Sequence, residues 1–166
     1  SIDAQLRLAH QEFCTLADYY RISTLYRLHH QDLDLLRKKI AATQIRPLSE
    51  AALEHFSFTT QYMNHYLQAL FHRIEGDQVA YQEYLGKTLE VWRKNHYMRE
   101  AHSRVYKIHL SNYLSSGHKL GSYEEFPHLL QELRSIPSQG RKEEVETFQN
   151  RVFYELLYRI NTENFE

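Results

Sequence analysis

The sequence predicts an all-α protein in which antiparallel helix-turn-helix repeats stack as a right-handed solenoid. Apolar residues recur at helical spacing, and no stretch has the pattern of a strand. Only 5 Gly and 3 Pro are present, too few for the turns of a many-stranded sheet. Four short turns also recur, with second positions 45, 45 and 42 residues apart, a period typical of stacked helical repeats. These turns are His30-Gln31-Asp32-Leu33, Glu75-Gly76-Asp77-Gln78, Leu120-Gly121-Ser122-Tyr123 and Thr162-Glu163-Asn164-Phe165.

Composition excludes several classes of partner. The net charge of −1 provides no basic excess for a nucleic acid, and no apolar run is long enough to span a membrane. A single cysteine, Cys14, excludes an internal disulfide framework and fits the cytoplasm, where we expect the protein to reside. We expect residues 1–166 to form a single repeat domain. Because the chain stops at Glu166, directly after the fourth turn, we also expect it to be a piece of a longer protein.

The first repeat unit is predicted to contain a long helical stretch and a shorter helix. Residues 2–28 carry apolar side chains at steps of three, four and seven, and whether they form one helix or two is left open. Asp32 is a candidate N-cap for the shorter helix, which Pro47 ends. The periodic residues of the first stretch are Leu6, Phe13, Leu16, Tyr20 and Leu28.

The second unit is predicted to contain a long helix over residues 50–74, with Ser49 before its first turn. Gly76 ends this helix, because glycine adopts the left-handed conformation favoured at helix C-termini. A second helix then reaches about Asn95. The apolar residues of the first helix are Leu53, Phe56, Met63, Leu67, Leu70, Phe71 and Ile74.

The third unit begins with a predicted helix over residues 97–118 that is apolar on two sides. Ser122 and Glu125 match a capping box that would start the next helix. Residues 136–140 form a loop, and a last helix carries apolar residues from Val145 to Ile160. The two seams of the 97–118 helix are Met98, Ala101, Val105 and Ile108 on one side, and Tyr106, Leu110, Tyr113, Leu114 and Gly117 on the other.

The second and third turns carry a family resemblance. The segments 74–77 (Ile-Glu-Gly-Asp) and 120–126 (Leu-Gly-Ser-Tyr-Glu-Glu-Phe) resemble the central turn of the tetratricopeptide (TPR) repeat, and Ala69 lies where that family places a small residue. The chain is similar to divergent TPR-like arrays of uncharacterised bacterial proteins, with a period longer than the usual one of about 34 residues. The resemblance implies a non-catalytic scaffold that binds a peptide or protein partner in a concave groove.

In such an array the first helix of each pair usually lines the inner face. Polar stripes on the 50–74 and 97–118 helices are therefore the predicted partner-binding surface, although polar residues at this spacing are also typical of an ordinary solvated face. The candidate residues are Gln61, His65, Gln68, His72, Arg104, Lys107, Ser111 and His118.

Catalytic and metal chemistry have little support in the sequence. The 11 histidines include no His-x-x-His or His-x-x-x-His pair, and no nucleophile elbow, phosphate loop or dinucleotide fingerprint occurs. We therefore expect no enzyme activity and no cofactor. The alternative is an enzyme or metal protein whose site is completed by other regions of a longer chain. A homodimer through the exposed end of the repeat stack is a further expectation.

Overall fold

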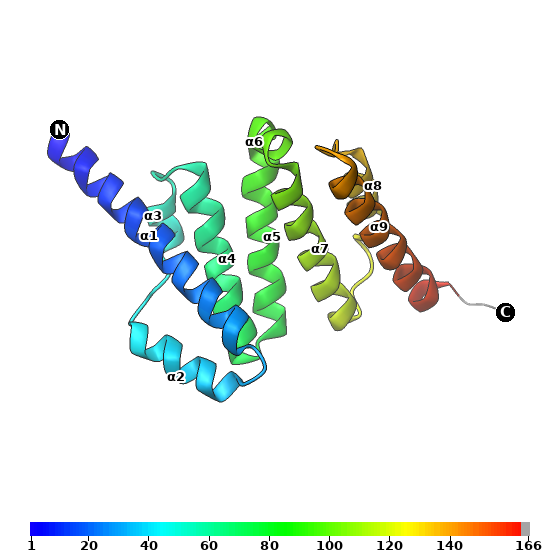
Figure 1. Cartoon of the computed structure of the whole chain (residues 1–166), viewed down its shortest axis with the longest axis horizontal. Coiled ribbons are helices and arrows are strands. Elements are labelled where there is room, and N and C mark those ends of the chain that lie inside the picture. Colours follow the sequence, from blue (N-terminus) through cyan, green and yellow to red (C-terminus); the bar gives the residue numbers. More distant parts are fainter. Residues whose placement is uncertain (164–166) are drawn as a thin grey trace. The chain divides into compact units, whose positions relative to one another are not determined.

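The computed structural model describes residues 1–163, and these contain helices and no strand (Figure 1). The all-α prediction is therefore confirmed for the described chain. Its contacts define two compact units, one from Ser1 to Val91 and one that begins at Trp92. The helices are α1 (Ile2–His29), α2 (Leu33–Thr43), α3 (Glu50–Leu53), α4 (Phe58–Glu75), α5 (Gln78–Lys94), α6 (His96–Ala101), α7 (Ser103–Leu120), α8 (Phe126–Ser135) and α9 (Arg141–Thr162).

The first three predicted turns separate consecutive helices, as the sequence indicated. Gly76 (φ 89°) and Gly121 (φ 68°) end α4 and α7 in the left-handed conformation, where a β-carbon would be strained. Asp32 caps α2 by accepting a hydrogen bond from the Leu35 amide at 3.0 Å. Of the fourth turn, Thr162 ends α9, and Asn164 and Phe165 lie outside the described residues.

The core of the first unit forms where α1, α2 and α4 meet. The helical stretch at the start of the chain is one uninterrupted helix of 28 residues, α1, which packs against α2 and α4 (Figure 1). Leu36 and Ile40 lie four residues apart on α2, so both point into the same core. The buried cluster comprises Ile22, Leu36, Ile40, Ile45, Leu67, Leu70 and Ile74.

The prediction of one helix over residues 50–74 is wrong. The chain leaves the helix after Leu53 and starts again at Phe58. Ser57 has an extended backbone (φ −62°, ψ 157°), and its hydroxyl accepts a hydrogen bond from the Thr60 amide. Leu53 and Phe56 are buried on either side of the break. The apolar spacing therefore continues through a non-helical segment. For this reason periodicity alone did not detect the break between α3 and α4.

The predicted 97–118 helix is also divided. His102 has non-helical dihedrals (φ −124°, ψ 43°) and separates α6 from α7. Only one of the two predicted apolar seams is buried, the one that contains Tyr106, Leu110 and Leu114. On the other seam Ile108 is 50% exposed, so the expectation of a helix covered on two sides is not met.

The predicted capping box at the start of α8 does not form. The Ser122 hydroxyl donates to the side chain of Glu124, and Glu125, the N-cap residue, makes no side-chain capping bond. Pro127 lies in the first turn of α8, where its missing N–H removes no helical hydrogen bond. The sequence signal for the start of α8 is therefore Pro127 and not the predicted capping box.

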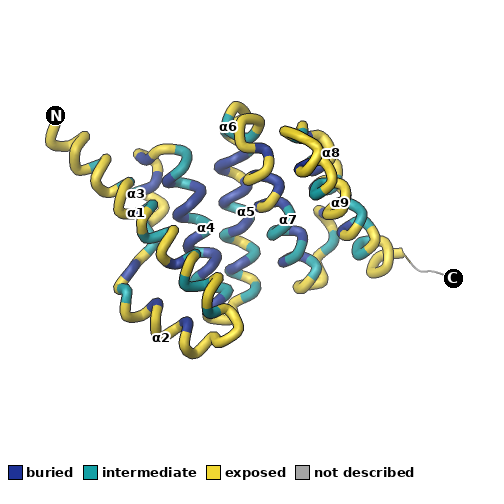
Figure 2. Tube along the Cα trace, in the orientation of Figure 1, coloured by how far each residue is buried: buried dark blue, intermediate teal, exposed yellow. Residues whose placement is uncertain are grey.

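The second unit is held together by the packing of α7, α8 and α9 on one another. Leu110, Leu114, Leu129 and Leu133 are essentially inaccessible to solvent, and Figure 2 shows the buried positions on facing sides of these helices. Among the described helices, none is both long and apolar enough to cross a membrane.

Candidate functional site

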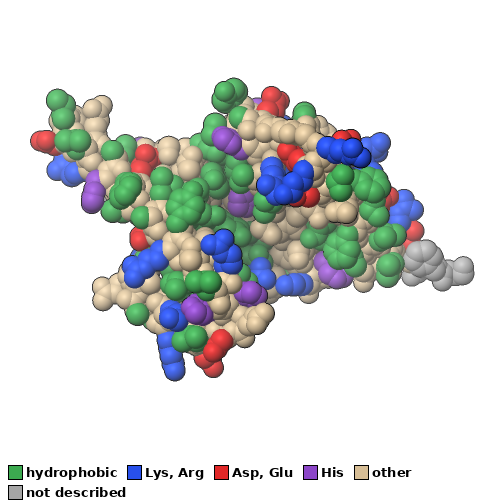
Figure 3. Space-filling model, in the orientation of Figure 1, with side chains coloured by type: hydrophobic (Ala, Val, Ile, Leu, Met, Phe, Trp, Pro, Cys, Tyr) green, Lys and Arg blue, Asp and Glu red, His purple; other side chains and the backbone are tan. Residues whose placement is uncertain are grey.

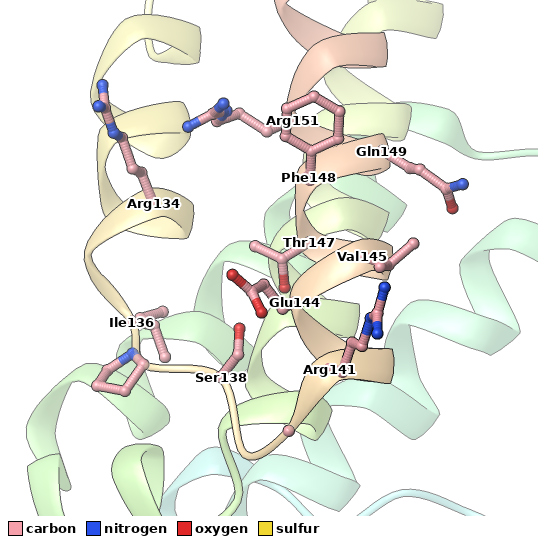
Figure 4. Close-up of a pocket in the computed structure, with 12 residues that line it drawn as sticks. Arg134, Ile136, Ser138, Arg141, Glu144, Val145, Thr147, Phe148, Gln149 and Arg151 are labelled. Carbon is pink, nitrogen blue, oxygen red and sulfur yellow. The ribbon is translucent and has the colours of Figure 1, made fainter.

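An open cleft runs between α8 and α9 in the second unit. Its larger part has a volume of about 980 Å³ and lies where the 136–140 loop joins the two helices. A smaller part of about 490 Å³ continues along the helices, and both parts are lined by Arg134 and Arg151. In Figure 4 Arg151 reaches from α9 toward α8, and Arg134 extends along α8 at the same end of the cleft.

Three arginines define the cleft, which we call the arginine cleft: Arg134, Arg141 and Arg151. Arg134 and Arg141 are exposed, and none of the three forms an ion pair with a carboxylate of residues 1–163. Glu144 is the acidic residue that lines the larger part. The larger part of the cleft therefore has an excess of positive charge. The smaller part is also lined by Glu155, Arg159 and Glu163, and Arg159 pairs with Glu155 at 3.1 Å. Figure 3 shows Lys and Arg side chains at the surface in this region.

Arg151 is the most constrained of the three arginines. Its guanidinium lies over the Phe148 ring, 5.5 Å from the centroid, in a cation–π contact. Its Nε atom is buried and has no hydrogen-bond partner within the described chain. A buried donor without a partner is costly, so a ligand oxygen that reached this atom would gain more than a surface contact provides.

The loop beneath the cleft is fixed by a buried ion pair between α7 and α9. Lys107 Nζ lies 2.9 Å from Glu143 Oε1 and also donates to the carbonyl of Pro137 and the hydroxyl of Ser138. The other carboxylate oxygen of Glu143 accepts a hydrogen bond from the Gln139 amide at 2.9 Å. Burial alone would raise the pKa of Glu143, but these hydrogen bonds hold it below its ordinary value. The pair thus connects both ends of the loop to the core.

A second carboxylate, the half-buried Glu132, is also fully engaged. It faces away from the cleft toward Arg93, which binds it through two nitrogens at 3.3 and 2.8 Å. Arg99 lies 3.8 Å away, and the Tyr106 hydroxyl donates to the same carboxylate. Burial would raise the pKa of Glu132, but Arg93 and Tyr106 lower it below the usual range. A carboxylate with this many partners stabilises the packing of α7 and α8 and holds Arg93 and Arg99 beside them.

The candidate residues on α4 are turned toward neighbouring segments. All four are half-buried. Gln61 donates to the carbonyl of Phe56 at 2.8 Å, and Gln68 donates to that of Leu48 at 3.3 Å. His72 stacks on Tyr84 of α5 with ring centroids 5.1 Å apart, and His65 lies 6.4 Å from the same ring. This stripe supports the 48–56 segment and α5.

The candidate residues on α7 make contacts with α9 and with the turn before α8. Arg104 pairs with Glu146 at 3.2 Å, and both side chains are partly exposed. The Ser111 hydroxyl accepts a long hydrogen bond from Asn150, and His118 Nδ1 lies 2.6 Å from the Tyr123 hydroxyl. Lys107 is buried in its ion pair and does not lie on a solvent-facing stripe, contrary to expectation. The structure does not bring the α4 and α7 candidates together within one unit.

The arginine cleft was missed because its residues have no common period. Arg134, Arg141 and Arg151 are separated by seven and ten residues, and a loop lies between the first and second. The signal that could have identified the cleft is the Pro137–Gly140 loop, which places the end of α8 beside the start of α9.

The described part of the chain contains no cluster of side chains that could bind a metal ion. Within residues 1–163, no three His, Cys, Asp or Glu side chains come close enough together to hold an ion.

Comparison with known proteins adds no constraint. No family model, curated protein or solved structure matches the chain. The TPR-like relationship therefore stays a prediction, and the function is argued from the residues of the arginine cleft.

Proposed function

We propose that this protein is a non-catalytic recognition module that binds an acidic peptide segment of a partner protein in the arginine cleft. The observation that carries the proposal is the set of three arginines without carboxylate partners around one open cleft. The guanidinium group offers paired N–H donors that match a carboxylate, so Arg134 and Arg151 are suited to acidic side chains.

Apolar surface beside the arginines favours a peptide over a small anion. Phe148, Val145 and Ile136 line the larger part of the cleft, and Pro127, Leu130 and Tyr158 line the smaller part. A segment in which acidic residues alternate with apolar ones would contact both kinds of surface. The cleft lies along two helices, which is the shape that an extended peptide requires.

We further propose that the helices stack as a right-handed TPR-like solenoid in a cytoplasmic protein. The recurrence of the three described turns supports this arrangement, as does the burial of Ala69, where a small side chain lets neighbouring helices approach closely. Repeat proteins of this kind use extended surfaces to bind partners, in agreement with the proposed recognition role.

The direct test measures binding of a fluorescent peptide of alternating Glu and Leu by anisotropy. We expect the Arg134→Glu/Arg151→Glu variant to bind at least tenfold more weakly, because charge-assisted hydrogen bonds contribute about 1.5–3 kcal/mol each. Lys38→Glu/Lys39→Glu is the matched control, with the same change in charge at two exposed positions of α2. It should bind as tightly as the wild type.

Three outcomes would contradict the proposal. Equal loss in both variants would mean a response to net charge, and equal binding by all three proteins would place the site elsewhere. Tighter binding of a single-stranded oligonucleotide than of the peptide would identify the ligand as a nucleic acid.

A further inference from the structure

α1 has two apolar faces, and the first unit uses only one of them. On the inner face Thr15 and Ile22 are buried, and Tyr19 and Tyr26 pack against the core cluster. The opposite face remains uncovered. Figure 2 shows α1 exposed along most of its length, and Figure 3 shows hydrophobic side chains at the surface in this region.

The uncovered face carries a strict heptad pattern. Its residues follow one another at steps of 4, 3, 4, 3 and 4, which is the a/d spacing of a coiled coil. Ile2 is 75% exposed, Leu6 63%, Phe13 70% and Tyr20 60%, values unusual for side chains of this size. We call this face the α1 seam, composed of Ile2, Leu6, Ala9, Phe13, Leu16 and Tyr20, of which Leu16 is half-buried and the others are exposed.

A seam of this period specifies the geometry of its partner. Residues repeated every 3.5 positions stay in line only when two helices wind around each other with a left-handed twist. From Ile2 to Tyr20 the seam is about 27 Å long at 1.5 Å per residue. The next positions in the same register are Ser23 and Arg27, which end it. The partner is therefore a helix with the same repeat.

We propose that the partner is α1 of a second copy of this chain and that the two helices pair in parallel. The seam is complementary to itself, because each a or d side chain meets its own equivalent across a parallel pair. The residues that flank the seam distinguish the two directions. In the parallel pair Glu12 faces Ala17 of the partner, and Gln5 faces His10. Glu12 also accepts a hydrogen bond from the Ser57 amide of its own chain, at the edge of the seam nearer the core. In the fully overlapped antiparallel pair the two Glu12 carboxylates lie on the same edge, which places like charges together.

The area of the seam sets the expected strength of the dimer. Four large side chains on each copy, all at least 60% exposed, would bury on the order of 1,000 Å² in total. This is the lower limit of a specific interface, so the dimer should dissociate in the micromolar range.

The first test is the oligomeric state over a concentration range of about 1 to 500 µM, measured by sedimentation velocity. We expect a reversible monomer–dimer equilibrium that Leu6→Gln/Phe13→Gln weakens at least tenfold. Phe153→Gln/Ile160→Gln is the matched control on α9, where the side chains are 56% and 63% exposed. It should leave the equilibrium unchanged. A monomer at every concentration, or loss of the dimer only in the control, would overturn the proposal.

The second test establishes the direction of pairing. In a Cys14→Ser background, Ala9→Cys places a thiol at a d position, where two parallel copies bring the β-carbons within disulfide reach. Oxidation should give a covalent dimer in this variant and none in the wild type, whose exposed Cys14 lies outside the seam. A dimer that does not cross-link at position 9 would overturn the parallel arrangement. Because the α1 seam and the arginine cleft share no residue, this test and the peptide-binding test fail independently.

Discussion

The polar stripe on α4 and the arginine cleft between α8 and α9 contain similar hydrogen-bonding groups in different surroundings. On α4 a neighbouring segment covers the stripe, and Gln61, Asn64 and Gln68 bond to backbone atoms of residues 48–56. In the cleft no segment of the described chain provides a carboxylate for Arg134 or Arg151. The spacing of polar residues along a helix therefore does not show whether they are free to bind a ligand. What decides this is whether another segment covers them.

The largest expected effect concerns the buried ion pair beneath the cleft. Lys107→Met leaves Glu143 buried without its charged partner and should lower the free energy of unfolding by about 3–5 kcal/mol. Chemical denaturation measures this loss. The double variant Lys107→Met/Glu143→Leu removes both charges and should regain most of the stability. A double variant as unstable as the single one would show that the loss comes from packing and not from the unpaired charge.

A second prediction concerns pH. Burial lowers the pKa of His109 to about 4, whereas an unfolded histidine titrates near 6.5. Between these values the unfolded state binds the proton more readily, so stability is complete above about pH 6.5 and is lost as the pH falls toward 4. The full difference corresponds to about 3 kcal/mol, of which about 2 kcal/mol is lost by pH 5, and Tm measured from pH 7 to 5 should fall accordingly. His109→Gln should flatten the profile, while exposed His55→Gln should not; identical profiles for all three proteins would refute the assignment.

A smaller loss is expected on α4. The amide of Asn64 is completely buried and bonds both backbone atoms of Leu48, at 2.8 and 3.1 Å. Asn64→Ala should cost about 2 kcal/mol, because two hydrogen bonds are lost and the Leu48 amide loses its side-chain partner, while the Leu48 carbonyl keeps its bond from Gln68. Gln68→Ala, which removes one 3.3 Å bond at a half-buried position, should cost less than half as much in the same denaturation experiment. If Gln68→Ala costs more stability than Asn64→Ala, the buried Asn64 amide is not the main contact that holds the 48–56 segment.

The smallest effect on stability is expected in the cleft itself. Arg134→Glu/Arg151→Glu should lower the free energy of unfolding by no more than about 1 kcal/mol, since these side chains have no ion-pair partner to lose and the main contact removed is the cation–π contact of Arg151 with Phe148. Thermal unfolding of the variant and the wild type checks this. A large destabilisation would show that the arginines belong to the fold, and would remove the distinction between them and the α4 stripe.

Sequence patterns predicted the helix boundaries where a single residue determines the backbone. Gly76 and Gly121 fix the left-handed ends of α4 and α7, and Asp32 fixes the start of α2. The breaks at Ser57 and His102 were missed, because apolar residues continue at helical spacing on both sides of each. At Ser57 the backbone amide donates to the carboxylate of Glu12 on α1, 45 residues away, a tertiary contact that a local pattern does not contain.

The same reasoning explains why the candidate site was only partly predicted. Lys107 was identified as a polar residue of interest, but its partner Glu143 lies 36 residues away on another helix. Only the packing of α7 against α9 determines that the two meet in the core. The opposite error affected α1, where Leu6 and Phe13 have the spacing of core residues and yet remain exposed. Period indicates that residues share a face of a helix but not which face the fold covers.

The anchored 136–140 loop has a consequence for binding thermodynamics. Because the Lys107–Glu143 pair holds the loop from below, the end of α8 and the start of α9 keep their separation before any ligand arrives. A ligand would then meet a preorganised receptor, and the entropy loss on binding would fall mainly on the peptide. A substitution at Lys107 could therefore weaken affinity from outside the binding surface, by allowing the receptor to sample conformations in which α8 and α9 no longer keep their separation.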